Sequence, residues 1–161
     1  MLEDHVSDCI KMRGDVDIII DNIYGNREFF SVKNAILTTA KNSHANALCN
    51  EIGQTYQYYI SDMIFGTNGT LSGAPKVVEA SRTGLFGATL ISKSVISTVN
   101  SQALNQAIFT AVVGFDEGNG NVINEMALVM KNGDLYSMVT LGGISKDSTI
   151  QVTFNWRITW I

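Results

Sequence analysis

Charged side chains are scarce in this chain. Asp, Glu, Lys and Arg make up 16% of its 161 residues, whereas an average soluble domain contains roughly 25%. Neutral polar residues, chiefly Asn, Gly, Ser and Thr, take their place. Burying an unpaired charge costs far more free energy than burying a hydroxyl or an amide. The low charge content therefore favours a protein whose surface is largely covered by neighbouring molecules.

Clusters of basic residues and long apolar runs are also missing. The Lys and Arg residues are scattered and the formal net charge is −4, so no nucleic-acid partner is expected. The longest apolar run is far shorter than a bilayer span, so no membrane partner is expected. The first residues, MLEDHVSDCIKMRG, lack the apolar segment of a secretory signal.

Cysteine and proline are nearly absent. The two cysteines, Cys9 and Cys49, are too few for a disulfide scaffold, which predicts synthesis in a reducing cytoplasm. A chain of this length has room for one domain and can bury a core without a metal or a disulfide. Pro75, the only proline, lies in the glycine-rich segment 66–75, which predicts a loop.

Most of the chain predicts β-structure. Residues 15–24 are rich in β-branched side chains, Gly25-Asn26 is a turn sequence and residues 27–30 return, so a β-hairpin is expected here. Later strands are expected at residues 56–65, 85–91, 94–99, 105–115, 122–130, 135–141 and 149–161. A turn is expected at Asn132-Gly133, and Gly142-Gly143 is expected to end the strand before it.

Residues 150–160 carry the clearest periodic pattern. Apolar and polar side chains alternate strictly over this segment, which indicates a long strand with one face on the core. The apolar positions are Ile150, Val152, Phe154, Trp156, Ile158 and Trp160. Both tryptophans are therefore expected in the core.

One helix is expected, at about residues 31–52. Ser31 is a suitable N-cap, and apolar residues recur at spacings of three and four from Val32 to Ile52. The predicted fold is mainly β: a β-sandwich or jelly-roll-like domain with this one α-helix in the N-terminal half. Residues 1–14 are expected to form an N-terminal arm and residues 15–161 a single β-rich structural domain.

The sequence offers no clear catalytic or metal-binding set. His5, Cys9, His44 and Cys49 are the residue types of a zinc site, but their spacing matches no standard finger. The more ordinary interpretation places His44 on the helix and packs Cys49 as a small hydrophobe. No serine lies in a nucleophile motif.

The acidic residues and the glycine-rich segments are equally unspecific. Asp116 and Glu117 are expected to be solvated in a turn, and Glu125 is expected to face outward from its strand or to pair with a Lys or Arg. Segment 116–121 lacks the ligand pattern of a calcium loop, and segment 66–75 lacks a Walker lysine. No catalytic, cofactor-binding or metal-ligating residue, no cofactor and no enzymatic activity are expected.

The C-terminal half carries a resemblance to a known family. Its motifs are residues 123–128 (INEMAL), 132–136 (NGDLY), Lys146 and 152–158 (VTFNWRI), with upstream matches at 45–48 (ANAL), 59–66 (YISDMIFG) and 82–87 (RTGLFG). This pattern resembles virion structural proteins of tailed bacteriophages, a β-rich family of the tail-fibre, collar or decoration type. The motifs mark fold positions, so they assign no functional residue.

The resemblance implies a non-enzymatic virion subunit that is made in the host cytoplasm. Such a protein assembles with itself, as a homo-oligomer, and with other virion proteins, through strand edges and the N-terminal arm. The tail, neck, collar or fibre-attachment region fits a chain of this length better than a complete fibre. The alternatives are a capsid head decoration protein and, in another class, a carbohydrate-binding module, for which Tyr56, Tyr58 and Tyr59 are the open candidates.

Overall fold

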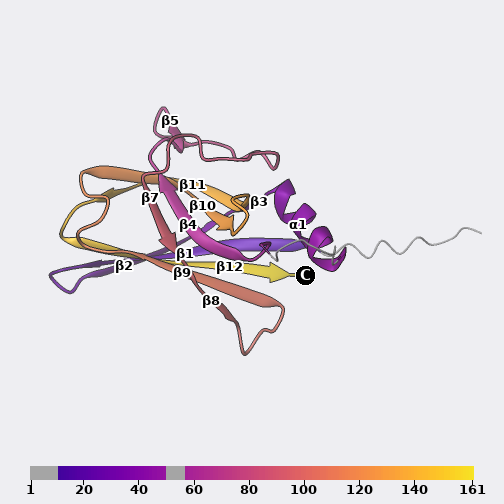
Figure 1. Ribbon diagram of the computed structural model, residues 1–161. Helices are drawn as coiled ribbons and strands as arrows, with labels where there is room; N and C mark the ends of the chain where they lie inside the picture. Colours follow the sequence, from indigo (N-terminus) through magenta and orange to yellow (C-terminus); the bar gives the residue numbers. More distant parts are fainter. Residues whose placement is uncertain (1–10, 50–56) are drawn as a thin grey trace, which may run out of the picture.

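The computed structural model describes residues 11–49 and 57–161, which form two facing five-stranded sheets and one helix (Figure 1). The elements are β1 (Met12–Asn22), β2 (Arg27–Lys33), β3 (Ala35–Ile36), α1 (Thr38–Cys49), β4 (Ile60–Gly66), β5 (Thr70–Leu71), β6 (Ala74–Pro75), β7 (Ile91–Ser94), β8 (Ile96–Val99), β9 (Gln106–Val113), β10 (Asn121–Met130), β11 (Leu135–Lys146) and β12 (Ile150–Trp160). The prediction of a mainly β fold is confirmed, and the two sheets are consistent with a β-sandwich.

Each side of the sandwich is closed by a segment that passes from one sheet to the other. Sheet A has the strand order β2-β1-β12-β9-β8, and sheet B has the order β3-β11-β10-β4-β7. Only Asn34 separates β2 from β3, and only Val95 separates β7 from β8. Because β2 and β8 stand at the two ends of the strand order in sheet A, they are its two edges.

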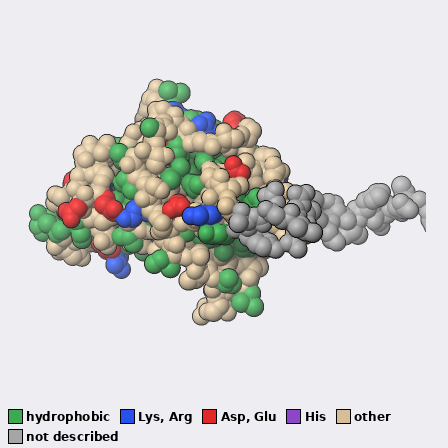
Figure 2. All heavy atoms as spheres, in the orientation of Figure 1, with side chains coloured by type: hydrophobic (Ala, Val, Ile, Leu, Met, Phe, Trp, Pro, Cys, Tyr) green, Lys and Arg blue, Asp and Glu red, His purple; other side chains and the backbone are tan. Residues whose placement is uncertain are grey.

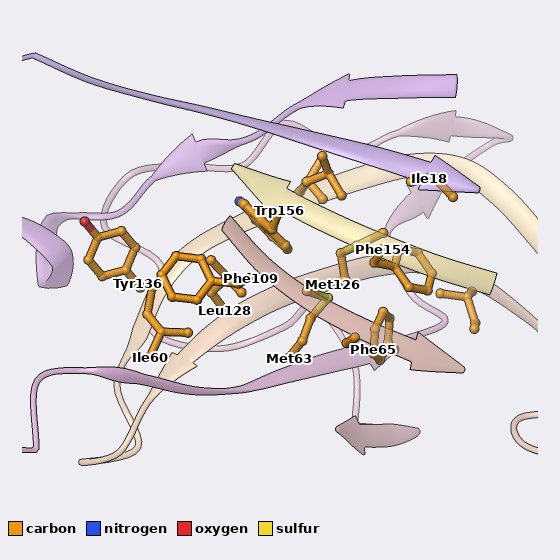
Figure 3. Packing of buried hydrophobic residues seen from close by; sticks show 14 of the residues in the cluster. Ile18, Ile60, Met63, Phe65, Phe109, Met126, Leu128, Tyr136, Phe154 and Trp156 are labelled. Atoms are coloured by element: carbon orange, nitrogen blue, oxygen red, sulfur yellow. The ribbon is translucent and has the colours of Figure 1, made fainter. Parts of the chain in front are cut away.

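The inner faces of the two sheets form the main core (Figure 3). On β12, Val152, Phe154, Trp156 and Ile158 are fully buried and alternate with half-exposed polar residues, which confirms the predicted strand and its core face. The ring of Phe154 lies 4.7 Å from that of Phe65 on β4. This is the aromatic contact that joins the centre of sheet A to sheet B.

Sheet B is also covered on its outer face. Leu37, Ala127, Leu135 and Met138 form a second buried cluster there, beneath the segment 67–90, which packs Val78, Leu85 and Phe86 against it. The long runs of buried residues in β10 and β11 follow from this double covering, because both faces of each strand are shielded from water. Figure 1 shows the segment around β5 over this face, whereas α1 lies at the end of the sandwich beside β3.

The predicted helix began too early. Ser31 and Val32 belong to β2 and pair with Asp17 and Val16 of β1, and α1 begins only at Thr38. The hydroxyl of Ser31 donates to the Asp17 carboxylate at 2.8 Å and caps no helix. The predicted end near residue 52 lies outside the described residues. Strand pairing with β1 therefore replaces the first turns of the expected helix.

The other boundaries differ in smaller ways. The hairpin at residues 15–30 is confirmed, although β1 starts at Met12 and so extends into the segment assigned to the arm; residues 1–10 are outside the described part of the chain. No strand forms at 85–90. Gly142-Gly143 does not end β11, which continues to Lys146 after a shift in its register with β10.

Candidate functional site

Of the four histidines and cysteines, only His44 has a side chain that the structure describes. His44 lies on α1, where its Nε2 is 2.7 Å from the hydroxyl of Tyr136. Cys49 is the last residue of α1, while His5 and Cys9 fall outside the described residues. Within residues 11–49 and 57–161, no three His, Cys, Asp or Glu side chains could hold one metal ion.

The acidic residues have separate structural partners. Glu117 accepts hydrogen bonds from Lys93 Nζ at 2.7 Å and from the Gly114 N–H at 2.8 Å, and these bonds lower the pKa of Glu117. The expectation that Glu117 is simply solvated is therefore wrong. Its ion pair joins the 114–121 loop to β7.

Glu125 holds the most unusual position of any carboxylate in the described chain. It is fully buried on β10, and the expectation that it faces outward or pairs with a base is wrong. Its Oε1 accepts the N–H groups of Asn68 at 3.0 Å and Gly87 at 3.1 Å, and its Oε2 accepts that of Phe86 at 2.6 Å. Glu125 thus fixes the segment 67–90 over sheet B by binding backbone donors.

The glycines around Glu125 are needed for this close approach. A Cβ added at Gly66 would lie 2.6 Å from Glu125 Oε1, and one at Gly69 would lie 2.1 Å from the backbone oxygen of Asn124. The Gly69 N–H donates to Asn124 Oδ1 at 2.6 Å. The glycine-rich segment that resembles a phosphate loop in composition therefore packs on β10, and its glycines serve that packing.

An aromatic pocket opens at the end of the sandwich near α1. Its volume is about 310 Å³, and it is lined mainly by apolar and aromatic side chains. They include Tyr58, Tyr59, Phe109, Tyr136 and Trp160, with His44 on one wall. Trp160 was expected in the core with Trp156, but it is only partly buried and faces this pocket edge-on to His44.

Burial shifts the titration of the two polar groups in this pocket. Desolvation lowers the pKa of His44 below its ordinary 6.5 and raises the pKa of Tyr136 to about 12. Both residues therefore remain neutral near pH 7. The site offers an uncharged, aromatic surface with one imidazole and one hydroxyl already bonded to each other.

The pH dependence of stability should reveal the burial of His44. Because its pKa is lower in the folded state than in the unfolded state, the unfolded chain takes up the proton first, and stability is lost as the pH falls below 6.5. His44→Gln should reduce this loss. Thermal unfolding of the two proteins at neutral and mildly acidic pH measures the loss of stability in each, and an equal loss in both would contradict the assignment.

The strand β8 forms an exposed sheet edge without charge. All four of its residues are exposed, and no Asp, Glu, Lys or Arg occurs anywhere in residues 94–115. Ile96 is 72% exposed, Val99 65% and Leu104 80%. In Figure 1 β8 and its turn project from the body, and Figure 2 shows this projection in green and tan, without red or blue.

Two backbone donors on the outer side of β8 have no hydrogen-bond partner among residues 11–49 and 57–161. The Asn100 N–H donates to Gln106 O, and β8 pairs antiparallel with β9 from Ile96 to Val99. Because hydrogen-bonded pairs alternate in such a ladder, Ile96 and Thr98 bond to β9 while the N–H groups of Ser97 and Val99 point outward. Charges, prolines and bulges are the usual protection of such an edge, and β8 contains no charge or proline.

The opposite edge of sheet A differs in chemistry. The strand β2 is also mostly exposed, and Phe29 is 64% and Tyr24 of the adjoining turn 78% exposed. It nevertheless carries Arg27, whose Nε donates to Asp21 at 2.6 Å, and Glu28. The uncharged β8 is therefore the stronger candidate for contact with another chain.

Within the described ranges, no helix is long and apolar enough to cross a lipid bilayer. No protein-family model, no curated protein sequence and no solved structure matches the chain.

Proposed function

We propose that this chain is a non-enzymatic structural subunit that assembles with copies of itself and with neighbouring virion proteins by strand addition at sheet A. The observation that carries the proposal is the uncharged, exposed strand β8. A neighbouring strand placed there would bond to the outward N–H groups of Ser97 and Val99 and would cover Ile96. Backbone hydrogen bonds and apolar burial would then stabilise the same contact.

A second copy of the chain is the partner favoured by the arrangement of sheet A. Its two edges, β2 and β8, lie on opposite sides of the sheet, so one copy can present an edge to each of two neighbours. The hydrogen bonds of Glu125 lie between sheet B and the segment 67–90, away from sheet A, and do not contribute to this contact. Assembly would therefore leave the core and Glu125 unchanged.

We place the subunit in a tailed-phage particle, in the tail, neck, collar or fibre-attachment region, with head decoration as the alternative. The family resemblance and the low charge support this setting. The test is the amount of this chain in purified particles. About a dozen copies per particle would support a neck, collar or fibre-base position, and hundreds would support decoration of a large surface; absence from the particles would contradict the proposal.

Carbohydrate binding is the second candidate, because aromatic side chains are common walls of sugar sites. Tyr59 is 58% exposed at the rim of the aromatic pocket, beside Trp160 and His44. Trp156 is fully buried and cannot form a sugar platform. A glycan-array screen separates this candidate from assembly, since binding that disappears in Tyr59→Ala would support it.

A further inference from the structure

A basic pocket lies at the corner where the chain passes from β2 to β3. Its volume is about 590 Å³, and four of its lining residues are Lys11, Arg13, Lys33 and Lys41. They come from the start of β1, the end of β2 and the helix α1. The corner thus concentrates positive charge in a chain whose net charge is −4.

Most of this positive charge has no partner in the described chain. Arg13 Nε is 3.1 Å from the Asp15 carboxylate. Lys11, Lys33 and Lys41 have no ion pair and no side-chain hydrogen bond within residues 11–49 and 57–161, and all three are exposed. Bringing like charges together without counter-ions is unfavourable, so the pocket is suited to an anionic group.

Asn34 indicates that the ligand also makes neutral hydrogen bonds. Both polar atoms of its side chain, Oδ1 and Nδ2, are buried without a hydrogen-bond partner among the described residues. The amide lies against Gly14, where an added Cβ would be 1.9 Å from Asn34 Oδ1. An unpartnered amide can donate to and accept from a peptide backbone, whereas an anion without O–H groups, such as sulfate, can only accept.

We infer that the acidic segment 1–10 of a second copy binds this pocket. The segment, MLEDHVSDCI, contains Glu3, Asp4 and Asp8 and no Lys or Arg, so its charge complements that of the pocket. Its backbone supplies the donors and acceptors that Asn34 lacks. The inference rests on the proposed assembly function and assigns a binding site to residues 1–10 of the expected N-terminal arm.

The direction of the chain at Lys11 favours a second copy over the same copy. The Lys11 N–H donates to Ile161 O at 2.9 Å, and the Ile161 N–H donates to Lys11 O at 2.7 Å. These bonds hold Lys11 in line with β1. Because Lys11 itself lines the pocket, the preceding residues would have to reverse at once to fill it in the same chain, whereas a neighbour's segment needs no such turn.

Charge reversal in the full-length chain tests the inference. The arm variant carries Glu3→Lys, Asp4→Lys and Asp8→Lys; the pocket variant carries Lys33→Glu and Lys41→Glu, both at exposed positions. Each variant alone should raise the dissociation constant of the oligomer, measured by sedimentation velocity at low salt, by about tenfold or more. An equimolar mixture of the two variants should restore the original dissociation constant. In the mixture, the acidic arm of the pocket variant meets the basic pocket of the arm variant, and the basic arm of the arm variant meets the acidic pocket of the pocket variant.

The outcomes separate the competing explanations. Restoration in a chain that carries all five changes, without restoration in the mixture, would mean that each arm binds its own pocket and would overturn the inference. Unchanged dissociation constants in both variants would overturn it too. Neither result would affect the proposed function, because the edge variants of β8 described in the Discussion test that separately. Circular dichroism of each variant confirms that it is folded.

Discussion

Replacing Glu125 with alanine is expected to lower the free energy of unfolding by about 3 kcal/mol or more, because each buried donor left without a partner costs about 1–3 kcal/mol. The buried carboxylate accepts backbone N–H groups from Asn68, Phe86 and Gly87. Removing it leaves these three donors facing a cavity. Chemical denaturation followed by tryptophan fluorescence measures the change.

Two further variants identify the cause of that loss. Glu125→Gln retains the oxygen that binds Asn68 and Gly87 but places an amide N–H₂ opposite the Phe86 N–H, so an intermediate loss is expected. Glu28→Ala, on the exposed face of β2, should change stability by less than about 0.5 kcal/mol. A Glu125→Ala protein as stable as Glu28→Ala would contradict this role.

Introducing charge at the β8 edge should abolish assembly while leaving the fold intact. Ile96→Lys with Val99→Lys places two ammonium groups where a neighbouring strand would cover them. Since burying unpaired charges costs several kcal/mol, the dissociation constant should rise by about 100-fold or more. Both side chains are largely exposed, so the free energy of unfolding should change by less than about 0.5 kcal/mol per site. Sedimentation velocity and chemical denaturation measure the two effects.

A proline and a matched surface variant serve as controls for the edge. Val99→Pro removes an outward N–H without breaking a bond to β9, so it should weaken assembly without adding charge. Val77→Lys changes a valine that is 79% exposed, against 65% for Val99, in the segment over sheet B, and it should leave assembly unchanged. Loss of assembly in Val77→Lys alone would place the interface on the other face of the molecule.

The parts of the fold that follow from local pattern were predictable from the sequence. The alternation at residues 150–160 predicted β12 and its core face, because a side-chain period of two has a single structural meaning over that length. The hairpin of β1 and β2 followed from the Gly25-Asn26 turn between β-branched residues.

The parts that depend on distant contacts were not predictable. Ser31 and Val32 suited the start of a helix, but both residues pair with β1 instead. Hydrogen bonding to the neighbouring strand outweighs their local helix preference. The local indication of a special role for Glu125 was the presence of an acid within a mostly apolar strand. Its partners lie 38 to 57 residues away along the chain, so no local pattern could identify them.

The β8 edge and the basic pocket were also only partly predictable from the sequence. The absence of charge from residues 94–115 is visible in the sequence, but only the strand order identifies β8 as an edge. The basic pocket brings residues 11–14 together with Lys33, Asn34, Ile36 and Lys41, which lie beyond the β1–β2 turn in the chain. Scattered lysines in the sequence therefore gave no indication of a cluster in space.

Amide hydrogen exchange at single-residue resolution tests the central claim most directly. In the dilute monomer, the Ser97 and Val99 amides should exchange quickly and the Thr98 amide slowly, because only Thr98 bonds to β9. At concentrations where the chain assembles, Ser97 and Val99 should become protected as well. Assembly that leaves both amides exchanging as fast as in the monomer would show that β8 is not the joining edge.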